Sequence, residues 1–404
     1  MIPEIEAKPY PLFNTIQNYS WGSRGKHAFI PQLLGIEAES SKTYAELWIG
    51  AHPNAPSQIL LDRNKYPLNK VINTYPELIL GMTVSQKFSR ELPFLFKVLS
   101  AREALSIQTH PDKKTAEYLH QKDPEHYPDD NHKPEIAIAI DRLKALVGFR
   151  QDKEIKKVLK RYPEIGQFIG QKIISEYMAG NSDEKAFKRL FEIMMTKAEN
   201  EPESLDSLCS QMAFNINRKD NPSERDNLFI ELREKYGADI GLIVIYFLNL
   251  INLKEGEAVF LKAGVPHAYL AGNIIECMAN SDNVVRAGLT PKYKDIETLV
   301  KITDYSSGYP EIQKPTSDSR KIVKYKAPVK EFTILRYQLN AGDELKINTE
   351  FKIEILLSME GKQKIITPQK NIIIKKGQSV LLPGCLERYR IQSEKNSLLF
   401  RVTI

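Results

Sequence analysis

The feature that most constrains the fold of this 404-residue chain is a change of local pattern in its middle. Between residues 151 and 251, apolar residues recur at the spacing of an amphipathic helix, as in 185-KAFKRLFEIMMTKAEN-200. The flanking parts, 1–150 and 252–404, contain short apolar runs bounded by glycine and proline, which is typical of strands and turns. The sequence therefore predicts a mainly β protein that carries an α-helical insert.

This change of pattern divides the chain into three predicted domains. Within the strand-rich parts, 256-GEAVFLKAG-264 and 377-GQSVLLPG-384 repeat a Gly-x-x-Val-x-Leu pattern, which a double-sheet antiparallel barrel would produce. His267 follows the first copy, and the sequence contains no later histidine, so only the first copy can contribute a histidine to a metal site. The predicted domains are 1–150 together with 252–319, then the insert 151–251, and finally 320–404.

Composition and charge argue against several classes of protein. The net charge of +6 is spread along the chain without basic blocks that interleave aromatic residues, so nucleic acid is not an expected partner. The three cysteines form no CxxC pair or disulfide framework, which fits a reducing cytosol, and residues 1–13 do not resemble a signal peptide. The longest apolar stretch, 240–253, is shorter than the ~20 residues of a membrane span and predicts a buried helix. We therefore expect a cytoplasmic protein without a membrane partner.

The segment 104-ALSIQTHPDK-113 places Gln108 and His110 two residues apart, directly before Pro111. In a strand, residues i and i+2 point to the same face, so both side chains are expected in the same space. A histidine beside a glutamine on a buried face needs a hydrogen-bond partner, a charge or a metal. A short helix is predicted directly afterwards, at 114–122.

Two further segments carry candidate metal ligands. The polar start of 131-NHKPEIAIAI-140 contains Glu135, and His267 follows another predicted strand. Together with Gln108 and His110, these residues would supply two nitrogen and two oxygen ligands, which suits zinc with one position left for water or substrate. The alternative is that each histidine is an ordinary core or surface residue, and glutamine is a rare metal ligand.

Six segments, spread over about the first three quarters of the chain, combine turn residues with these candidate ligands: 17-QNYSWGS-23, 46-ELWIGAHPNAPS-57, 93-PFLFKVLSAREALSIQTHPDK-113, 131-NHKPEIAIA-139, 256-GEAVFLKAGVPHAYLAG-272 and 275-IECMANSDNVVRAGLTPK-292. In this order and combination they resemble the type I mannose-6-phosphate isomerase (phosphomannose isomerase) family. The C-terminal block matches that family only in general character.

The resemblance implies a cupin-like jelly-roll catalytic barrel, a helical domain inserted into it, and a second, C-terminal jelly roll. It also implies one zinc ion per chain, bound by Gln108, His110, Glu135 and His267, which are the residues that chemistry and spacing already nominate. The implied reaction is the aldose–ketose interconversion of mannose 6-phosphate and fructose 6-phosphate through an enediolate, a step of carbohydrate metabolism and GDP-mannose biosynthesis.

Proton transfer in such a reaction needs a base whose pKa suits neutral pH, and the enediolate needs a nearby positive charge. Arg286 is the candidate for that charge. Glu276 is preferred as the base, because apolar neighbours on its strand would raise its pKa. The alternatives are a buried pair between Glu276 and Arg286, and support of Glu135 by His132 and Lys133. The full set of candidates for the base is Glu276, His132, Lys133 and Asp282.

The phosphate of such a substrate needs a basic pocket. Arg286 and Lys292 lie on one loop-rich segment, and Lys97 and Ser106 precede the candidate ligands. Ser106 has the strand parity of those ligands, so it is expected to face the same cavity. Trp21 is a candidate wall for the sugar. A lysine that faces water and a tryptophan in the core are the commoner explanations for single residues of these types.

Two other classes compete with the isomerase. A metal-dependent cupin oxygenase would also use two histidines and one carboxylate, but it has no general need of Gln108 or of a phosphate pocket. A non-catalytic sugar-phosphate-binding protein predicts that a ligand or base is missing, and none is missing here. No GxGxRLxPL-type segment is present, which disfavours a fused nucleotidyltransferase. We expect a monomer whose partner is a sugar phosphate.

Overall fold

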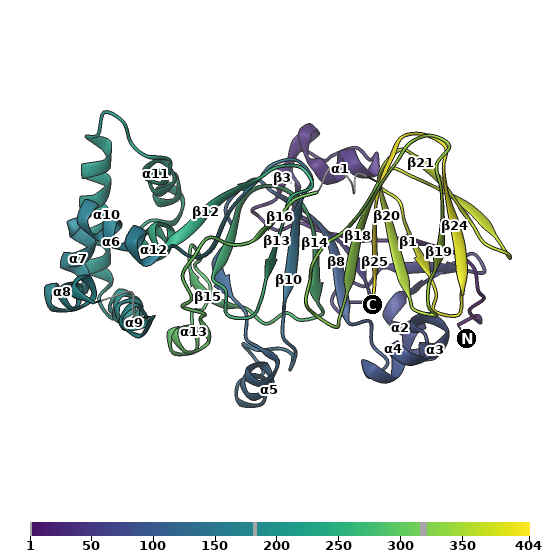
Figure 1. Ribbon diagram of the computed structural model, residues 1–404, viewed down its shortest axis with the longest axis horizontal. Coiled ribbons are helices and arrows are strands. Elements are labelled where there is room, and N and C mark those ends of the chain that lie inside the picture. Colours follow the sequence, from purple (N-terminus) through teal and green to yellow (C-terminus); the bar gives the residue numbers. More distant parts are fainter. Residues whose placement is uncertain (1, 181–183, 316–320) are drawn as a thin grey trace.

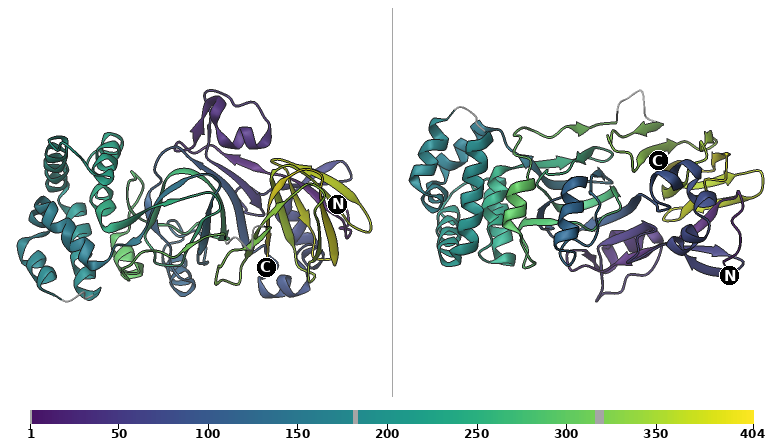
Figure 2. Two further views of the ribbon diagram at one scale, coloured as in Figure 1. Left: turned by 45° about the horizontal axis from the view of Figure 1, so that its top comes forward. Right: turned by 90° about the horizontal axis from the view of Figure 1, so that it is seen from below.

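The computed structural model describes residues 2–180, 184–315 and 321–404 and shows an elongated, strand-rich molecule (Figure 1). Helices form one end, an antiparallel sheet region lies in the middle, and a second antiparallel sheet region forms the other end (Figures 1 and 2). The predicted fold class, mainly β with a helical insert, is confirmed. No helix in the described ranges has the length and apolar character that a bilayer crossing needs.

The middle region is an 11-stranded sheet organised around its longest strand, β14 (His267–Ala279). The C-terminal part of β14 pairs with β8 (Phe94–Ala101) and β10 (Glu135–Ala139), and its first residues pair with β9 (Ile107–Thr109) and β11 (Leu143–Phe149). The other strands of this sheet are β2 (Thr15–Gln17), β5 (Glu46–Gly50), β12 (Leu248–Leu253), β13 (Ala258–Leu261), β15 (Val285–Gly288) and β16 (Ile312–Gln313).

Alternation along β10 shows how this sheet separates two cores. Ile136 and Ile138 pack into a cluster that continues into the second sheet region, whereas Ala137 and Ala139 pack with Tyr269 on the other face. Glu135 has the parity of the two alanines, so its carboxylate starts on their side of the sheet. These small side chains leave space for polar groups of neighbouring strands.

The second region combines an eight-stranded and a four-stranded sheet. Strands from the N-terminal part of the chain join the larger sheet, because β1 pairs with β23 and with β6. The predicted division placed all of 1–150 with the first sheet, and the exact domain boundaries stay a prediction. The strands of this region are β1 (Tyr10–Phe13), β6 (Gln58–Leu61), β7 (Asn64–Pro67), β17 (Ile322–Lys324), β18 (Thr333–Leu339), β19 (Glu344–Asn348), β20 (Glu354–Glu360), β21 (Lys362–Ile366), β22 (Asn371–Lys375), β23 (Ser379–Leu382), β24 (Arg388–Ser393) and β25 (Ser397–Thr403).

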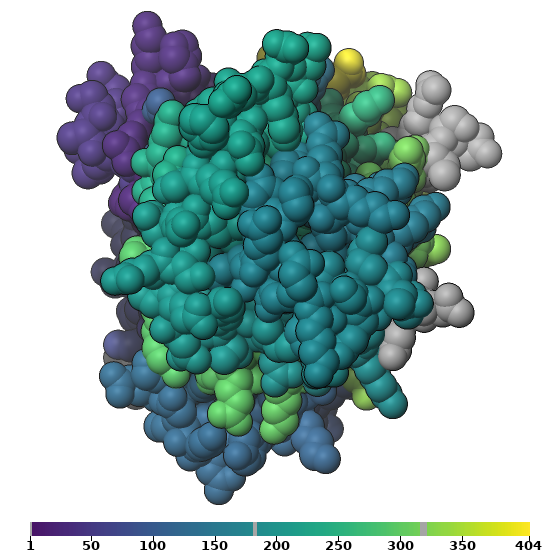
Figure 3. All heavy atoms as spheres, turned by 90° about the vertical axis from the view of Figure 1, so that its left-hand side faces the viewer, coloured from purple at the N-terminus to yellow at the C-terminus, as the bar shows by residue number. Residues whose placement is uncertain are grey.

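The helical insert covers one end of the molecule (Figure 3). Its helices pack through stripes of apolar residues at helical spacing, as Phe187, Leu190, Phe191 and Met194 do in a single core cluster. The helices are α6 (Asp152–Arg161), α7 (Pro163–Ile169), α8 (Gln171–Ala179), α9 (Glu184–Asn200), α10 (Pro202–Asn217), α11 (Glu224–Tyr236) and α12 (Gly241–Phe247).

The prediction of one buried helix over 240–253 is wrong in its second half. Helix α12 ends at Phe247, and Leu248–Leu253 forms strand β12, which pairs with β11. The Nδ2 atom of Asn249 lies within hydrogen-bond distance of four backbone carbonyl oxygens, including that of Phe149 at 3.0 Å. Its two N–H groups are shared among these carbonyls and hold the change from helix to strand in place. An apolar run alone does not distinguish a buried helix from a buried strand.

Short elements complete the fold. Helix α5 (Lys113–Lys122) matches the helix predicted after the His-Pro-Asp turn, and the Asp112 carboxylate caps it by accepting from the Thr115 amide at 2.8 Å. Four helices of five to seven residues in the first 90 residues were not predicted, because fewer than two turns leave little periodicity. The remaining elements are α1 (Phe29–Leu34), α2 (Leu68–Thr74), α3 (Pro76–Leu80), α4 (Met82–Lys87), α13 (Ile296–Ile302), the 3-10 helix Gly25–His27, β3 (Ser23–Arg24) and β4 (Thr43–Tyr44).

Candidate active site

Three buried side chains from separate strands meet inside the middle sheet region. Glu135 opens β10, His267 opens β14, and His110 follows the last residue of β9. The Nε2 atom of His267 lies 3.0 Å from Glu135 Oε1, and the Nε2 atom of His110 lies 3.7 Å from Glu135 Oε2. One atom from each of these residues lies within 4.8 Å of the other two, a spacing that a single metal ion can bridge.

The histidine orientations fit a metal. The Nδ1 atoms of His110 and His267 lie 2.8 and 2.9 Å from the backbone oxygens of Asn283 and Val265, so each Nδ1 is placed to donate there. This leaves each buried Nε2 as a lone pair without a hydrogen-bond partner among the described residues, facing the Glu135 carboxylate. Burial, and then the charge of Lys133, hold the pKa of His110 well below its usual range, so its ring is neutral. Two imidazole nitrogens and a carboxylate aimed at one another are an arrangement that fits a bound cation.

Gln108 lies beside this cluster. It pairs with His267 across β9 and β14, and with Arg286 across β9 and β15. The hydroxyl of Ser106 donates to Gln108 Oε1 at 3.3 Å. The strand itself ends at Thr109, so the alternation argument for His110 extends one residue past regular β structure.

Three charged side chains, Glu46, Lys97 and Glu276, form a row across the middle sheet, on the face that also carries Glu135. Lys97 on β8 is directly opposite Glu276 on β14 and Trp48 on β5. The Nζ atom of Lys97 lies 3.3 Å from Glu276 Oε2 and 3.4 Å from Glu46 Oε2, and all three charged side chains are less than 10% exposed. Glu276 therefore pairs with Lys97, not with Arg286 as one interpretation of the sequence held.

This row determines the protonation of Glu276. Burial raises the pKa of the Glu276 carboxyl, and the charges of Glu135 and Glu46 add to the effect, while Lys97 opposes it. The pKa of Lys97 is raised because Glu46 and Glu276 outweigh its burial. The pKa of Glu276 is thus shifted upward, toward neutral pH, which is the property that a general acid or base requires.

Lys133 and Tyr269 complete the immediate surroundings. Lys133 is buried, and the structure gives it no hydrogen bond or ion pair with any described residue. The hydroxyl of Tyr269 donates to Glu135 Oε1 at 3.2 Å, and burial raises the pKa of this phenol well above its usual value. Sequence reasoning missed Tyr269, although it stands two residues after His267 on one strand and therefore shares its face.

Asp282 lies in a polar network of its own. Its carboxylate contacts His52 Nε2 at 3.3 Å and accepts from the Asn54 side chain at 3.0 Å. Burial alone would raise the pKa of Asp282, but the hydrogen bond from His52 and the charges of Lys133 and Lys97 lower it. Asp282 is therefore an ionised carboxylate, held in place by a histidine that the sequence did not single out.

The remaining predicted substrate residues differ in their surroundings. Arg286 is half-buried, burial lowers its pKa, and it forms no ion pair or hydrogen bond with the described residues. Lys292 is exposed, four residues beyond the end of β15. Trp21 is half-buried, stacks on Tyr19 with 5.8 Å between ring centroids, and packs against the apolar cluster of the barrel interior.

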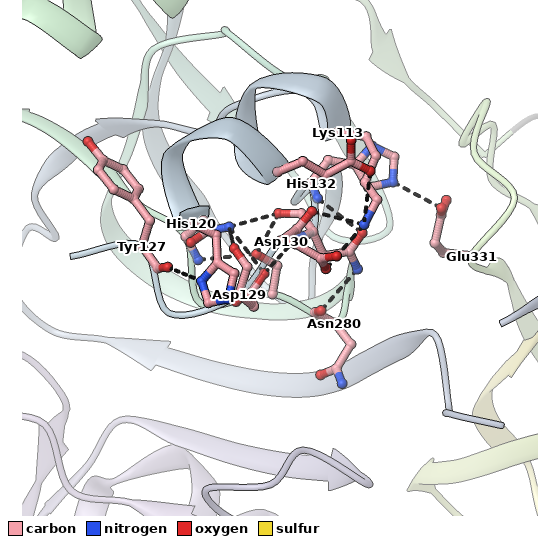
Figure 4. A network of polar contacts seen from close by, with 12 residues as sticks. Lys113, His120, Tyr127, Asp129, Asp130, His132, Asn280 and Glu331 are labelled. Carbon is pink, nitrogen blue, oxygen red and sulfur yellow. Dashed lines mark hydrogen bonds and ion pairs between the residues drawn. The ribbon is translucent and has the colours of Figure 1, made fainter. Parts of the chain in front are cut away.

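His132, unlike its sequence neighbour Lys133, contacts a carboxylate in the described structure. Its Nε2 lies 2.9 Å from Glu331 Oε1, a residue of the segment that leads into β18 (Figure 4). This contact joins the loop before β10 to the C-terminal region. We therefore leave His132 out of the proton-transfer machinery.

The loop before β10 also positions a metal-site histidine, which the sequence did not reveal. Asn283, whose carbonyl faces His110, is fully buried, and its side chain donates to the backbone oxygens of Asp129 and Asn131 at 2.7 and 2.9 Å. The Asn131 side chain in turn donates to the Asn280 carbonyl at 3.1 Å (Figure 4). The orientation of His110 thus depends on contacts between segments about 150 residues apart.

A separate cavity of about 980 Å³ lies between residues 304–311 and 324–329. None of the predicted site residues lines it. The metal cluster, with its charged row, remains the place where titratable groups with shifted pKa values converge.

The fold and the site together define a class: an antiparallel, cupin-type barrel protein that holds one metal ion beside a carboxyl of raised pKa. Residues 10–152 match the family model described as the catalytic domain of type I phosphomannose isomerase. The chain is 39% identical to the mannose-6-phosphate isomerase of Rattus norvegicus, with 97% of each chain covered. It is 36% identical to mannose-6-phosphate isomerase 2 of Arabidopsis thaliana, over 92% of this chain and 88% of the relative.

Solved structures of phosphomannose isomerases have the same fold as this chain. A mutant of phosphomannose isomerase from Salmonella typhimurium matches with a TM-score of 0.87 at 30% identity, covering 98% of both chains. A zinc-bound mannose 6-phosphate isomerase matches with a TM-score of 0.85, also at 30% identity and 98% coverage of both chains. The chain belongs to the type I phosphomannose isomerase family.

Proposed function

We propose that this chain is a zinc-dependent aldose–ketose isomerase that interconverts mannose 6-phosphate and fructose 6-phosphate. The observation that carries the proposal is the buried cluster of His110, Glu135 and His267, whose unpartnered Nε2 atoms face a carboxylate next to the pKa-shifted Glu276. Full-length relatives that bear the name mannose-6-phosphate isomerase support the substrate. The predicted monomeric state and cytoplasmic location stay predictions.

The proposed metal ligands are His110, Glu135, His267 and Gln108. Bound zinc would supply a Lewis acid for the substrate oxygens at C1 and C2. The residues fit this ion, because zinc accepts imidazole nitrogens and carboxylate or amide oxygens as ligands. The set contains no thiolate, the ligand typical of closed structural zinc sites. Tyr269, which donates to Glu135, and Asn283, which accepts from His110, would hold the ligands in orientation.

Isomerisation moves a proton from C2 of the aldose to C1 of the ketose. We assign this transfer to Glu276, whose raised pKa lets it accept and return a proton near neutral pH. Lys97 holds the Glu276 carboxylate at 3.3 Å and keeps it available as a base. Lys133, buried and without a partner among the described residues, is placed to exchange the hydroxyl protons at O1 and O2.

Positive charge is needed for both the enediolate and the phosphate. Arg286 has no carboxylate partner in the described structure, so its guanidinium is available to either group. Lys292 and Ser106 are proposed to contact the phosphate, and Trp21 to border the sugar. Asp282 is proposed to fix the loop that carries Arg286, through its contacts with His52 and Asn54.

The test is the isomerisation of mannose 6-phosphate to fructose 6-phosphate before chelation, after chelation, and after zinc is returned. We expect activity that disappears with the chelator and recovers with zinc. Glu276→Gln should lower turnover by about 10²–10⁴-fold, the usual contribution of a general base. Glu311→Gln, at a carboxylate that is 78% exposed, is the matched control and should leave turnover unchanged. A fully metallated protein that fails to isomerise the substrate, or consumes oxygen instead, would refute the proposal.

A further inference from the structure

A basic cavity lies in the helical insert, apart from the metal cluster. It has a volume of about 450 Å³ and lies between α6, the first turn of α11 and the junction of α12 with β12. Helix α6 presents Glu154, Lys157 and Arg161 to it from one face, as their spacing of three and four residues requires. Arg150 precedes α6, and Arg225 comes from the first turn of α11.

Basic side chains outnumber acidic ones in the lining, four to two. The two carboxylates already have partners. Glu154 contacts Arg150 at 3.1 Å and Lys157 at 2.8 Å, and Glu224 contacts Lys144, outside the lining, at 3.0 Å. Glu154 therefore neutralises part of the positive charge of the cavity, and a net positive charge remains in its lining.

Arg225 is the basic residue of the lining that has no ion pair with a described carboxylate. It donates to the backbone oxygen of Ile245. A guanidinium has five N–H donors, and this is the one hydrogen bond that the described structure gives to the Arg225 side chain. Burial, and then the charge of Arg150, lower the pKa of Arg225 to about 10, which shows that its surroundings disfavour the positive charge.

A buried carboxylate behind the cavity does not compensate for Arg225. Asp226 accepts hydrogen bonds from the hydroxyls of Tyr162 at 2.6 Å and Tyr246 at 3.0 Å, and from Lys219 at 3.2 Å. Arg161 lies at 3.9 Å from the same carboxylate, at the limit of an ion pair. The Asp226 carboxylate thus accepts hydrogen bonds from Tyr162, Tyr246 and Lys219, and none of these donors is Arg225.

We propose that this cavity binds a phosphoanion, the phosphate or diphosphate group of a small molecule. Arginine forks match phosphate oxygens, and Arg225 has no carboxylate partner among the described residues. The volume lies within the range of small-molecule sites, about 300–1,000 Å³. An anion bound there would supply the countercharge that Arg225 lacks among the described residues.

The site is separate from the proposed active site but connected to it through the sheet. Tyr246 and Leu250 line the cavity, and Leu250 on β12 pairs with Leu146 on β11. The next residue of β11, Val147, pairs with the metal-site residue His267. The binding test must therefore distinguish the two sites by location, not by activity.

Hydrogen exchange measured by mass spectrometry makes that distinction on the intact, zinc-loaded protein. We expect inorganic pyrophosphate to slow exchange in peptides covering 150–161 and 223–228. Arg225→Gln should abolish this protection, and Arg161→Gln, at a side chain that is 55% exposed, should weaken the apparent affinity by about tenfold. Arg218→Gln is the control, because Arg218 lies outside the cavity, over the ring of Phe214.

Each result has a defined meaning. Protection that is absent at millimolar pyrophosphate, or that persists unchanged in both folded cavity variants, overturns the proposal. If Arg225→Gln does not fold, Arg161→Gln decides by itself. Slower exchange only in peptides around Arg286 would show that pyrophosphate binds the active site alone, which also overturns it. Adenosine diphosphate in the same assay separates the sources: protection by both probes points to organic phosphates, and protection by pyrophosphate alone to the free anion.

Discussion

Lys97→Met removes the single cation that two buried carboxylates share. Methionine keeps the length and the apolar stem of lysine, so packing against Trp48, whose ring centroid is 5.1 Å from the Lys97 Nζ atom, is largely retained. Glu46 and Glu276 then lose their partner at 3.4 and 3.3 Å while remaining buried. Removing one member of a buried ion pair costs about 3–5 kcal/mol of unfolding free energy, because a charge is left without compensation.

The loss should depend on pH in a defined direction. The pKa of Glu276 is already raised above its ordinary value of 4.5, and losing the charge of Lys97 raises it further. Between the unfolded-state and folded-state pKa values, the folded protein then binds more protons than the unfolded chain, so stability falls as pH rises. The variant should therefore recover part of its lost stability between about pH 8 and about pH 5, and more of it than the wild type gains.

Urea unfolding followed by tryptophan fluorescence tests this reasoning, since both tryptophans, Trp21 and Trp48, belong to the middle sheet region. Lys326→Met is the control, because Lys326 is 82% exposed and its pair with Glu311 at 3.6 Å should contribute little. A Lys97→Met midpoint equal to that of the wild type at neutral pH, or one that falls as pH is lowered, would refute the account of this charge row.

Three further substitutions test other parts of the structure. Asn283→Ala removes the side chain that positions the carbonyl facing His110, and it should lower zinc affinity by about 10–100-fold in competition with a chelator. Asn249→Leu removes the two N–H donors that four carbonyls share and should lower the unfolding free energy by about 1–3 kcal/mol, measured by urea unfolding. Asp112→Ala removes the cap of α5 and should cost about 1 kcal/mol, with faster hydrogen exchange at the Thr115 amide.

Each of these outcomes can fail in a recognisable way. Unchanged zinc affinity in Asn283→Ala would mean that the loop does not orient His110. An Asn249→Leu protein as stable as the wild type would show that the helix-to-strand switch is held by β pairing alone. Unchanged exchange at Thr115 would remove the cap from the description of α5, and Lys114→Ala, at an exposed residue of the same helix, is its control.

The sequence by itself determined what depends on local pattern and residue chemistry. Apolar spacing predicts the helical insert, and alternation between turn residues predicts the strands, because both periods are properties of a few consecutive residues. Strand alternation and side-chain chemistry nominated Gln108, His110, Glu135 and His267, and the family resemblance selected the same residues. The apolar neighbours of Glu276 predicted the direction of its pKa shift, which the buried strand β14 confirms.

Only the tertiary structure decided which distant residues meet. The register of three strands places Lys97 between Glu46 and Glu276, and an interaction across a sheet leaves no local trace in the sequence. The same holds for β1, which joins the C-terminal sheet, and for the basic cavity around Arg225, whose walls come from separate helices. Strand pairing is set by closure of the whole sheet and by burial on both of its faces, and these are global properties of the folded chain.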